Sequence, residues 1–223
     1  MKATIITIAM IDAEELRSRL LRQKTTIPRF RIPYNEADTA KVLEAAYESE
    51  VRFRHRNYQA DEATKSNIAA VAKLLCDESK FGIMLCGNCG NGKTTMMYAI
   101  RNLVNYLSRM GAIAIGNTRP ELEVMDAMSI VKRAKDDELM NIATKQMLGI
   151  DDLGNEPAEV MNYGNVVNPL AELLEIRYKR QLYTIVTTNL IPRQIREKYG
   201  GRVADRLNEM FGVVIFKNST YRK

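Results

Sequence analysis

The chain has 223 residues, of which 46% are hydrophobic and 27% charged, a composition that is typical of a globular protein and excludes a disordered or collagen-like chain. It has no apolar run approaching the roughly 18 residues of a membrane helix and no signal-peptide pattern, and its three cysteines are not needed as staples in a chain this long. We therefore expect a cytoplasmic protein with no membrane partner.

The formal net charge of +6 is concentrated in the last quarter of the chain. Residues 171–223 contain eleven Lys or Arg and five Asp or Glu, so the rest of the chain sums to zero. Such an excess is typical of a surface that meets nucleic acid or phosphate. An ordinary solvated surface explains it equally well, so charge alone does not identify the partner.

The N-terminal part of the chain differs from the rest. Two helices are predicted there, over residues 12–22 and 36–50, with a proline-containing segment between them. Neither helix is long enough to hold a core alone. We expect residues 1–53 to form a small N-terminal helical appendage that is available for partner binding, and residues 54–223 to form the main domain.

Helical and apolar segments alternate along the main domain. A helix is predicted over residues 61–79, where an acidic start precedes a stripe of apolar residues. Short apolar runs then alternate with helical stretches, which is the pattern of a parallel sheet covered by helices on both faces. We predict an α/β fold with five strands, over residues 82–86, 112–116, 146–150, 183–188 and 213–216.

A glycine-rich loop directly follows the first predicted strand and leads into a helix. Its sequence GNCGNGKTT matches GxxxxGK[ST], in which backbone N–H groups turn towards phosphate oxygens at a helix N-terminus. Lys93 would supply charge for the β- and γ-phosphates during binding and catalysis, and Thr94 would be a ligand for Mg²⁺. The predicted ATP-binding residues are Gly87, Asn88, Cys89, Gly90, Asn91, Gly92, Lys93, Thr94 and Thr95.

An acidic pair ends the third predicted strand. The sequence MLGIDD places Asp151 and Asp152 after a hydrophobic run, which is the Walker B pattern. Asp151 would hold Mg²⁺ through water, and Asp152 would orient and polarise the attacking water. Capping of a turn is the alternative, because Asp-Asp-Leu-Gly is good turn sequence. Asp152 is one methylene shorter than the glutamate often found at this place, so we expect slow hydrolysis.

Polar residues also follow the fourth predicted strand. Asn189 would lie beside the strand end that carries Asp151, within reach of the γ-phosphate or its water; a simple strand-ending asparagine is the alternative. Further along, Arg202 and Arg206 are four residues apart and share one helix face. They are either surface cations or, in an oligomer, arginines that point into the neighbour's nucleotide and stabilise transition-state charge.

These four elements, in this order, resemble the AAA+ ATPases, and within them the DnaC and DnaI helicase loaders and the IstB transposition proteins. The resemblance runs from about Arg54 to the C-terminus and rests on GNCGNGKTT, MLGIDDLGNEP, EIRYKRQLYTIVTTNL, YGGRVADRLNEMFG and the terminal STYR. It implies a P-loop AAA+ core with a five-stranded parallel sheet and no C-terminal lid. It also implies that Asn189 is sensor I and Arg206 the trans-acting arginine finger, with Arg202 as second candidate.

Two more segments resemble parts of this family. RNYQADEATKSNIAAVAKLL resembles a segment in which Asn57 and Tyr58 would lie beside the adenine. Residues 120–146 resemble an extra helix that initiator-type AAA+ proteins place against single-stranded DNA; a solvated, lysine-rich helix face is the alternative. The DNA contacts implied by this helix are Lys132, Arg133 and Lys135.

The resemblance implies an ATP-hydrolysing helicase loader of DNA replication. Such a protein would form an ATP-dependent homo-oligomer and bind single-stranded DNA and a replicative DnaB-type helicase. An IstB-like ATPase that assists a transposase on duplex DNA shares every motif. A nucleotide-dependent adaptor with negligible hydrolysis is the third alternative, consistent with the short side chain of Asp152. Residues 1–53 depart from the family, so the resemblance does not set their partner.

Overall fold

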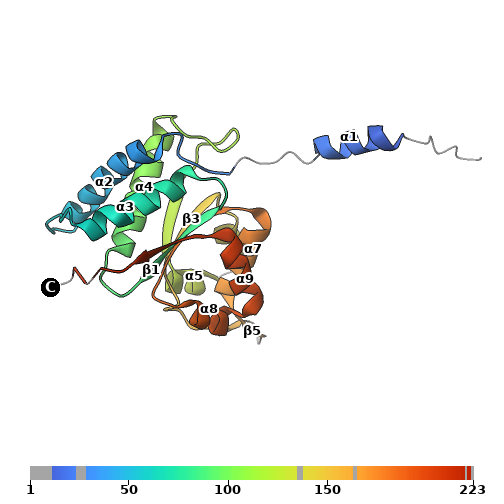
Figure 1. Ribbon diagram of the computed structural model, residues 1–223. Coiled ribbons are helices and arrows are strands. Elements are labelled where there is room, and N and C mark those ends of the chain that lie inside the picture. The colour runs from blue at the N-terminus through green and yellow to red at the C-terminus, as the bar shows by residue number, and fades with distance from the viewer. Residues whose placement is uncertain (1–11, 24–28, 135–137, 163–164, 219, 222–223) are drawn as a thin grey trace, which may run out of the picture.

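A central sheet enclosed by two layers of helices forms the body of the protein (Figure 1). The computed structural model describes residues 12–23, 29–134, 138–162, 165–218 and 220–221. Within these ranges, no helix combines the length and the apolar character that crossing a lipid bilayer requires.

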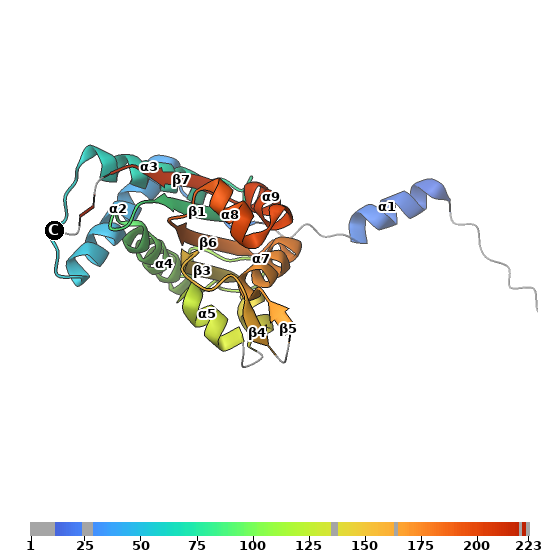
Figure 2. The ribbon, with the colours of Figure 1, turned by 90° about the horizontal axis from the view of Figure 1, so that it is seen from below.

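Five parallel strands form the sheet, in the order β2-β3-β6-β1-β7. The strand before the glycine-rich loop, β1, is next to β6, and β6 is next to β3, which carries the acidic pair (Figure 2). The predicted α/β fold with five core strands is confirmed. The strands are β1 (Gly82–Gly87), β2 (Leu122–Asp126), β3 (Met147–Leu153), β6 (Tyr183–Thr188) and β7 (Gly212–Phe216).

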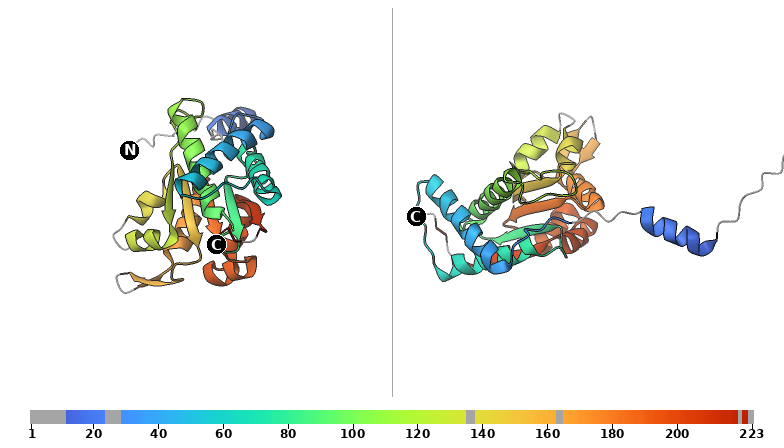
Figure 3. Two further views of the ribbon diagram at one scale, coloured as in Figure 1. Left: turned by 90° about the vertical axis from the view of Figure 1, so that its left-hand side faces the viewer. Right: turned by 90° about the horizontal axis from the view of Figure 1, so that it is seen from above.

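Side chains of the strands alternate between two hydrophobic clusters, because successive residues of a strand point to opposite faces. In β1, Ile83 and Leu85 are buried in the first cluster and Met84 in the second. Helices α2 to α4 close the first cluster and α5 to α9 the second (Figure 3). These helices are α2 (Glu36–Phe53), α3 (Glu62–Cys76), α4 (Lys93–Arg109), α5 (Ala127–Ala134), α6 (Leu139–Ala143), α7 (Pro169–Arg180), α8 (Pro192–Tyr199) and α9 (Gly201–Met210).

Side-chain caps fix the first turns of three helices. Asn35, Asp61 and Asn168 each accept a hydrogen bond from the backbone N–H three residues further on, at the starts of α2, α3 and α7. Each such cap contributes about 1 kcal/mol. Helix α4 begins at Lys93 without a side-chain cap, so its first N–H groups are open to another acceptor.

Both predicted N-terminal helices are confirmed, as α1 (Ala13–Gln23) and α2. The side chains of residues 13–22 are all exposed. By contrast, α2 packs against α3 and α4 and buries Leu43 and Tyr47 in the first cluster. The hydrophobic core therefore includes α2, and the division of the chain after residue 53 stays a prediction.

Four of the five predicted strands are confirmed, and the second is wrong. Residues 112–116 lead into a turn closed by a bridge between Ile115 and Thr118, and their apolar pattern reflects the burial of Ile113. The second strand is instead β2. It lies at the edge of the sheet, where charged residues such as Glu123 are tolerated, so it lacks the apolar run that marks a central strand.

Residues 120–146 are not a single extra helix, contrary to the expectation from the resemblance. They contain β2, α5 and α6, and α5 buries Ile130 and Val131 against the sheet and α7. Helices α5 and α6 are thus the connection between β2 and β3. A small antiparallel hairpin that was not predicted follows β3, with strands β4 (Val160–Asn162) and β5 (Asn165–Val167).

Candidate nucleotide-binding site

The carboxyl ends of β1, β6 and β3 meet at one edge of the sheet. Cys86 lies opposite Thr188 where β1 pairs with β6, and Ile150 lies opposite Val186 where β3 pairs with β6. The glycine-rich loop, the acidic pair and Asn189 follow these strand ends, at the edge where α/β sheets bind their ligands. Three separate parts of the chain are therefore brought together.

The glycine-rich loop needs its glycines for both conformation and space. Gly87, Gly90 and Gly92 have φ angles of +144°, +81° and +97°, which residues with a Cβ rarely adopt. A Cβ on Gly87 would lie 2.5 Å from the carbonyl oxygen of Phe216, and one on Gly92 would lie 2.6 Å from Tyr47 Oη. The loop is thus held closely by β7 and by α2.

Lys93 opens α4, and its ammonium group is enclosed by the loop. Its Nζ lies 2.8 Å from Gly87 O, 2.7 Å from Asn88 O and 3.1 Å from Asn91 Oδ1, and the residue is 5% exposed. Burial lowers the pKa of this amine from its ordinary value. Together with the uncapped N–H groups of α4, the ammonium gives the loop a positive end suited to phosphate.

One carboxylate oxygen of Asp151 accepts hydrogen bonds from two hydroxyl groups. Its Oδ1 is 3.0 Å from Thr94 Oγ1 and 2.5 Å from Thr187 Oγ1. Hydroxyl and carboxylate oxygens are the ligands that Mg²⁺ prefers, so the predicted pair Thr94 and Asp151 fits this ion. Thr187 was not predicted; its signal in the sequence is a polar side chain near the end of an otherwise apolar strand.

The backbone is irregular at the second acid. Asp152 has a φ of +55°, and the pairing register of β3 shifts between Ile150 and Leu153. The backbone N–H of Asp152 donates to Thr187 Oγ1 at 2.8 Å. Asn189 follows β6 directly and is exposed. Asp152 and Asn189 thus lie at the same sheet edge, and their roles towards a nucleotide stay predictions.

Arg202 and Arg206 lie on one face of α9, as their spacing predicts. Both approach Oε1 of Glu175 in α7, with Arg202 Nε at 3.4 Å and Arg206 Nη1 at 2.9 Å. Arg206 also lies over the ring of Tyr178, 5.1 Å from its centroid. The Arg206 side chain is 19% exposed and that of Arg202 is 69% exposed. Arg206 is thus held beside Glu175 while Arg202 is open to solvent, and a role of either residue towards a neighbour's nucleotide stays a prediction.

Arg177 lies between Glu175 and Tyr178 on α7 and is fully buried. Its guanidinium donates to Thr184 Oγ1 at 2.8 Å and to three backbone carbonyl oxygens. Burial lowers its pKa, while the four acceptors stabilise the charged form. This arginine belongs to the EIRYKRQLYTIVTTNL motif, but the motif does not indicate that it joins α7, α6 and β6. The acceptor carbonyls belong to Ala143, Lys145 and Tyr183.

Asn57 and Tyr58, the residues predicted beside the adenine, precede α3 in the chain. Tyr58 donates its hydroxyl hydrogen to Glu44 Oε1 at 2.7 Å, and its ring centroid is 6.2 Å from that of Tyr47. Asn57 is exposed. Tyr58 is therefore turned towards α2, and contact of either residue with a base stays a prediction.

The C-terminal segment contacts the glycine-rich loop, which sequence reasoning missed. The backbone N–H of Tyr221 donates to Gly90 O at 2.9 Å, and its hydroxyl donates to Asp61 Oδ2 at 2.9 Å. Asn218 Nδ2 donates to Asn91 O at 3.0 Å. The chain after β7 thus braces the outer side of the loop; the STYR motif was its signal in the sequence.

The predicted DNA contacts differ in their surroundings. Lys132 is exposed on α5. Arg133 is half-buried and donates from Nε to Glu138 Oε2 at 2.7 Å. Lys135 lies outside the described residues. Binding of DNA by these residues stays a prediction.

Comparisons with known proteins identify the fold. No family model and no curated protein matches the sequence. The structure of DnaI is 18% identical, with 82% of this chain and 93% of that chain covered and a TM-score of 0.56. The DnaC helicase loader is 19% identical, with 72% and 94% covered and a TM-score of 0.53. The replication initiator DnaA bound to AMPPCP and single-stranded DNA is 15% identical, with 73% and 49% covered and a TM-score of 0.50.

All three neighbours are below 20% identity and share the architecture of this chain. The described residues after β7 contain no helix and so no lid. The chain therefore shares its fold with DnaI and the DnaC helicase loader, as the resemblance to AAA+ proteins led us to expect.

Proposed function

We propose that this protein binds ATP with Mg²⁺ and hydrolyses it at the edge of its sheet. The observation that carries the proposal is the contact between Thr94 and Asp151 beside the enclosed ammonium of Lys93. Lys93 and the N–H groups of the loop bind the phosphates, and Thr94 and Asp151 hold Mg²⁺. The ion, when bound, neutralises charge that develops on the phosphates.

Hydrolysis then requires a placed water and stabilised charge. Asp152 orients the water, and Asn189 senses the γ-phosphate from the neighbouring strand end. Arg206 is proposed to act on the nucleotide of an adjacent subunit, with Arg202 as the more exposed alternative. Because the carboxylate of Asp152 is short and Arg206 starts in contact with Glu175, turnover by an isolated subunit is slow.

We further propose that the biological role is helicase loading in DNA replication. The proposal is supported by the likeness in fold to the DnaC helicase loader, to DnaI, and to a DnaA bound to AMPPCP and single-stranded DNA. In this role ATP favours a homo-oligomer that binds single-stranded DNA and a DnaB-type helicase, and hydrolysis reverses both interactions. Helix α1, exposed along residues 13–22, is the proposed contact with the helicase.

Fluorescence anisotropy tests the role with labelled single-stranded and duplex DNA, each with an ATP analogue, with ADP and without nucleotide. Two salt concentrations are needed, because phosphate contacts make affinity salt-dependent. The loader binds single strands more tightly with the ATP analogue than with ADP. Preference for duplex DNA would contradict the loader role and favour an IstB-like ATPase that assists a transposase. Binding to neither would favour an adaptor whose partner contacts the DNA.

A further inference from the structure

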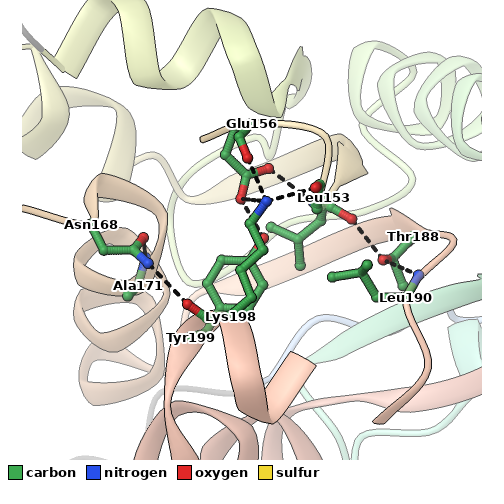
Figure 4. Close-up of polar contacts among 9 residues, drawn as sticks. Leu153, Glu156, Asn168, Ala171, Thr188, Leu190, Lys198 and Tyr199 are labelled. Atoms are coloured by element: carbon green, nitrogen blue, oxygen red, sulfur yellow. Dashed lines mark hydrogen bonds and ion pairs between the residues drawn. The ribbon is translucent and has the colours of Figure 1, made fainter. Parts of the chain in front are cut away.

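A buried carboxylate lies just beyond the acidic pair of β3. Glu156 is 3% exposed, and Figure 4 shows its polar contacts. The backbone N–H of Gly154 donates to its Oε2 at 2.9 Å, and the Tyr199 hydroxyl donates to its Oε1 at 2.5 Å. Lys198 Nζ lies 3.4 Å from the same Oε1. We call Glu156, Lys198 and Tyr199 the Glu156 cluster.

The Glu156 cluster holds the turn that contains Asp152. This turn is closed by a hydrogen bond from the N–H of Asn155 to Asp152 O at 3.1 Å. Lys198 Nζ donates to Gly154 O at 2.6 Å and also to Glu156 O. Gly154 is thus held at its N–H by the carboxylate and at its carbonyl by the lysine. Since Asp152 has a positive φ, this fixed turn helps to keep it in a conformation that is otherwise unfavourable.

The same contacts reach α8 and α7, which adjoin the helix α9 that carries Arg202 and Arg206. Lys198 and Tyr199 form the end of α8, and the carbonyl oxygen of Lys198 accepts a hydrogen bond from Asn168 Nδ2 of the α7 cap at 3.3 Å. Gly200, with a φ of +86°, leads directly into α9. The last turn of α8 is therefore fixed on one side to the turn after β3 and on the other to α7.

The end of β6 is tied to the same turn. Thr188 Oγ1 donates to Leu153 O at 2.7 Å and accepts from the N–H of Leu190 at 3.0 Å, as Figure 4 shows. Asn189 lies between Thr188 and Leu190, which the second of these bonds joins. The strand ends that carry Asp152 and Asn189 are therefore joined to α8 by hydrogen bonds through this turn.

Stability alone is a weak reason for a buried ion pair, because the cost of removing both charges from water offsets their attraction. Apolar residues of similar volume often serve the fold as well. A carboxylate that accepts two hydrogen bonds beside an ammonium group instead fixes orientation, because each hydrogen bond constrains both distance and angle. The arrangement thus indicates a requirement for position at this point of the fold.

We propose that Glu156 is a positioning residue that places Asp152 for the subunit's own nucleotide and α9, with Arg202 and Arg206, for the neighbour's nucleotide. A change at one site is then passed to the other through the Glu156 cluster. The inference rests on the proposed function, because it requires ATP hydrolysis with an arginine supplied by a second subunit.

The test uses the full chain with Glu156→Gln, which keeps the size of the side chain and removes its charge. Glu159→Gln is the matched control, since Glu159 is exposed in the segment that follows the same turn. ATP affinity and melting temperature are measured for each variant. Tyr199→Phe, which removes one donor and keeps the ring, is the milder second variant and is expected to change activity in the same direction.

Mixed assemblies separate the two roles. Asp152→Asn subunits cannot hydrolyse but can supply arginines, and Arg206→Ala subunits can hydrolyse but supply no finger. Mixing Glu156→Gln with Asp152→Asn tests the nucleotide site of the Glu156→Gln subunit. Mixing Glu156→Gln with Arg206→Ala tests the arginines that the Glu156→Gln subunit supplies to its neighbour. We expect both mixtures to be at least about tenfold slower than the corresponding Glu159→Gln mixtures, with ATP affinity changed by less than about twofold.

Each outcome decides the inference. The inference is wrong if Glu156→Gln supplies its arginines normally and fails only at its own site. It is also wrong if the substitution lowers the melting temperature but the folded protein performs both roles normally. The mixture of Asp152→Asn with Arg206→Ala checks the proposed function separately. If these two co-assemble without regaining activity, the trans arginine is wrong and the inference is overturned with it.

Discussion

Thr94 Oγ1 lies 3.0 Å from Asp151 Oδ1, although the two residues are 57 positions apart in the chain. The hydroxyl belongs to the first turn of α4 and the carboxylate to the end of β3. Parallel strands bring them together because β6 is inserted between β1 and β3 and all three end at the same edge. This contact joins the two motifs of the proposed metal–nucleotide site.

Thr187→Val is expected to weaken the use of Mg²⁺. The hydroxyl is buried and bonds both Asp151 Oδ1 and the N–H of Asp152. Valine keeps the shape and leaves that N–H without its acceptor, so we expect a loss of about 1–3 kcal/mol in stability and about a tenfold lower kcat. Titrating Mg²⁺ in an ATPase assay checks this. An unchanged Mg²⁺ dependence would show that Thr187 does not help to place Asp151.

Arg206→Ala is expected to leave ATP binding intact and to lower turnover by about 100-fold or more, because an arginine that stabilises transition-state charge acts only in the chemical step. Its contact with Glu175 is local to α7 and α9. Mixing it with Asp152→Asn should restore part of the activity, since one complete site forms at mixed interfaces. ATPase assays across mixing ratios measure this. No gain in activity at any mixing ratio of the two co-assembled variants would contradict a trans arginine.

The local motifs could be read from the sequence, and the contacts that connect them could not. The glycine-rich loop and the acidic pair each consist of neighbouring residues, so their pattern survives without the fold. Strand β2 was missed because an edge strand carries charged residues. The contact of Glu156 with Tyr199 spans 43 positions, and no local pattern indicates a pairing between residues so far apart.

Arg177→Met is expected to destabilise the fold without involving the nucleotide. Three backbone carbonyl oxygens and Thr184 would lose their donor in a buried place. We expect the free energy of unfolding to fall by about 3 kcal/mol or more. Urea denaturation checks this, with Arg180→Met as the control because Arg180 is exposed on the same helix. Equal stability of the two variants would contradict the structural role of Arg177.

Tyr221→Phe is expected to weaken ATP binding modestly. The hydroxyl bonds Asp61 Oδ2 at 2.9 Å and lies 3.0 Å from Thr64 Oγ1, while the backbone contact with Gly90 remains. Loss of one hydrogen bond to a carboxylate corresponds to about 1.5 kcal/mol, or roughly tenfold in affinity if the loop depends on it. Calorimetric titration with ATP measures the effect. Tyr106→Phe, on the exposed side of α4, should bind ATP like the wild type.

The central claim is that the loop around Lys93 binds the phosphates of ATP. Equilibrium binding of a fluorescent ATP analogue to Lys93→Ala tests it most directly, with Lys73→Ala as the control because Lys73 is exposed on α3. Removal of the enclosed ammonium should weaken binding by about 100-fold or more, since a charge-assisted contact inside a loop contributes about 3 kcal/mol, while the control binds normally. Tight binding by a correctly folded Lys93→Ala protein would contradict the account.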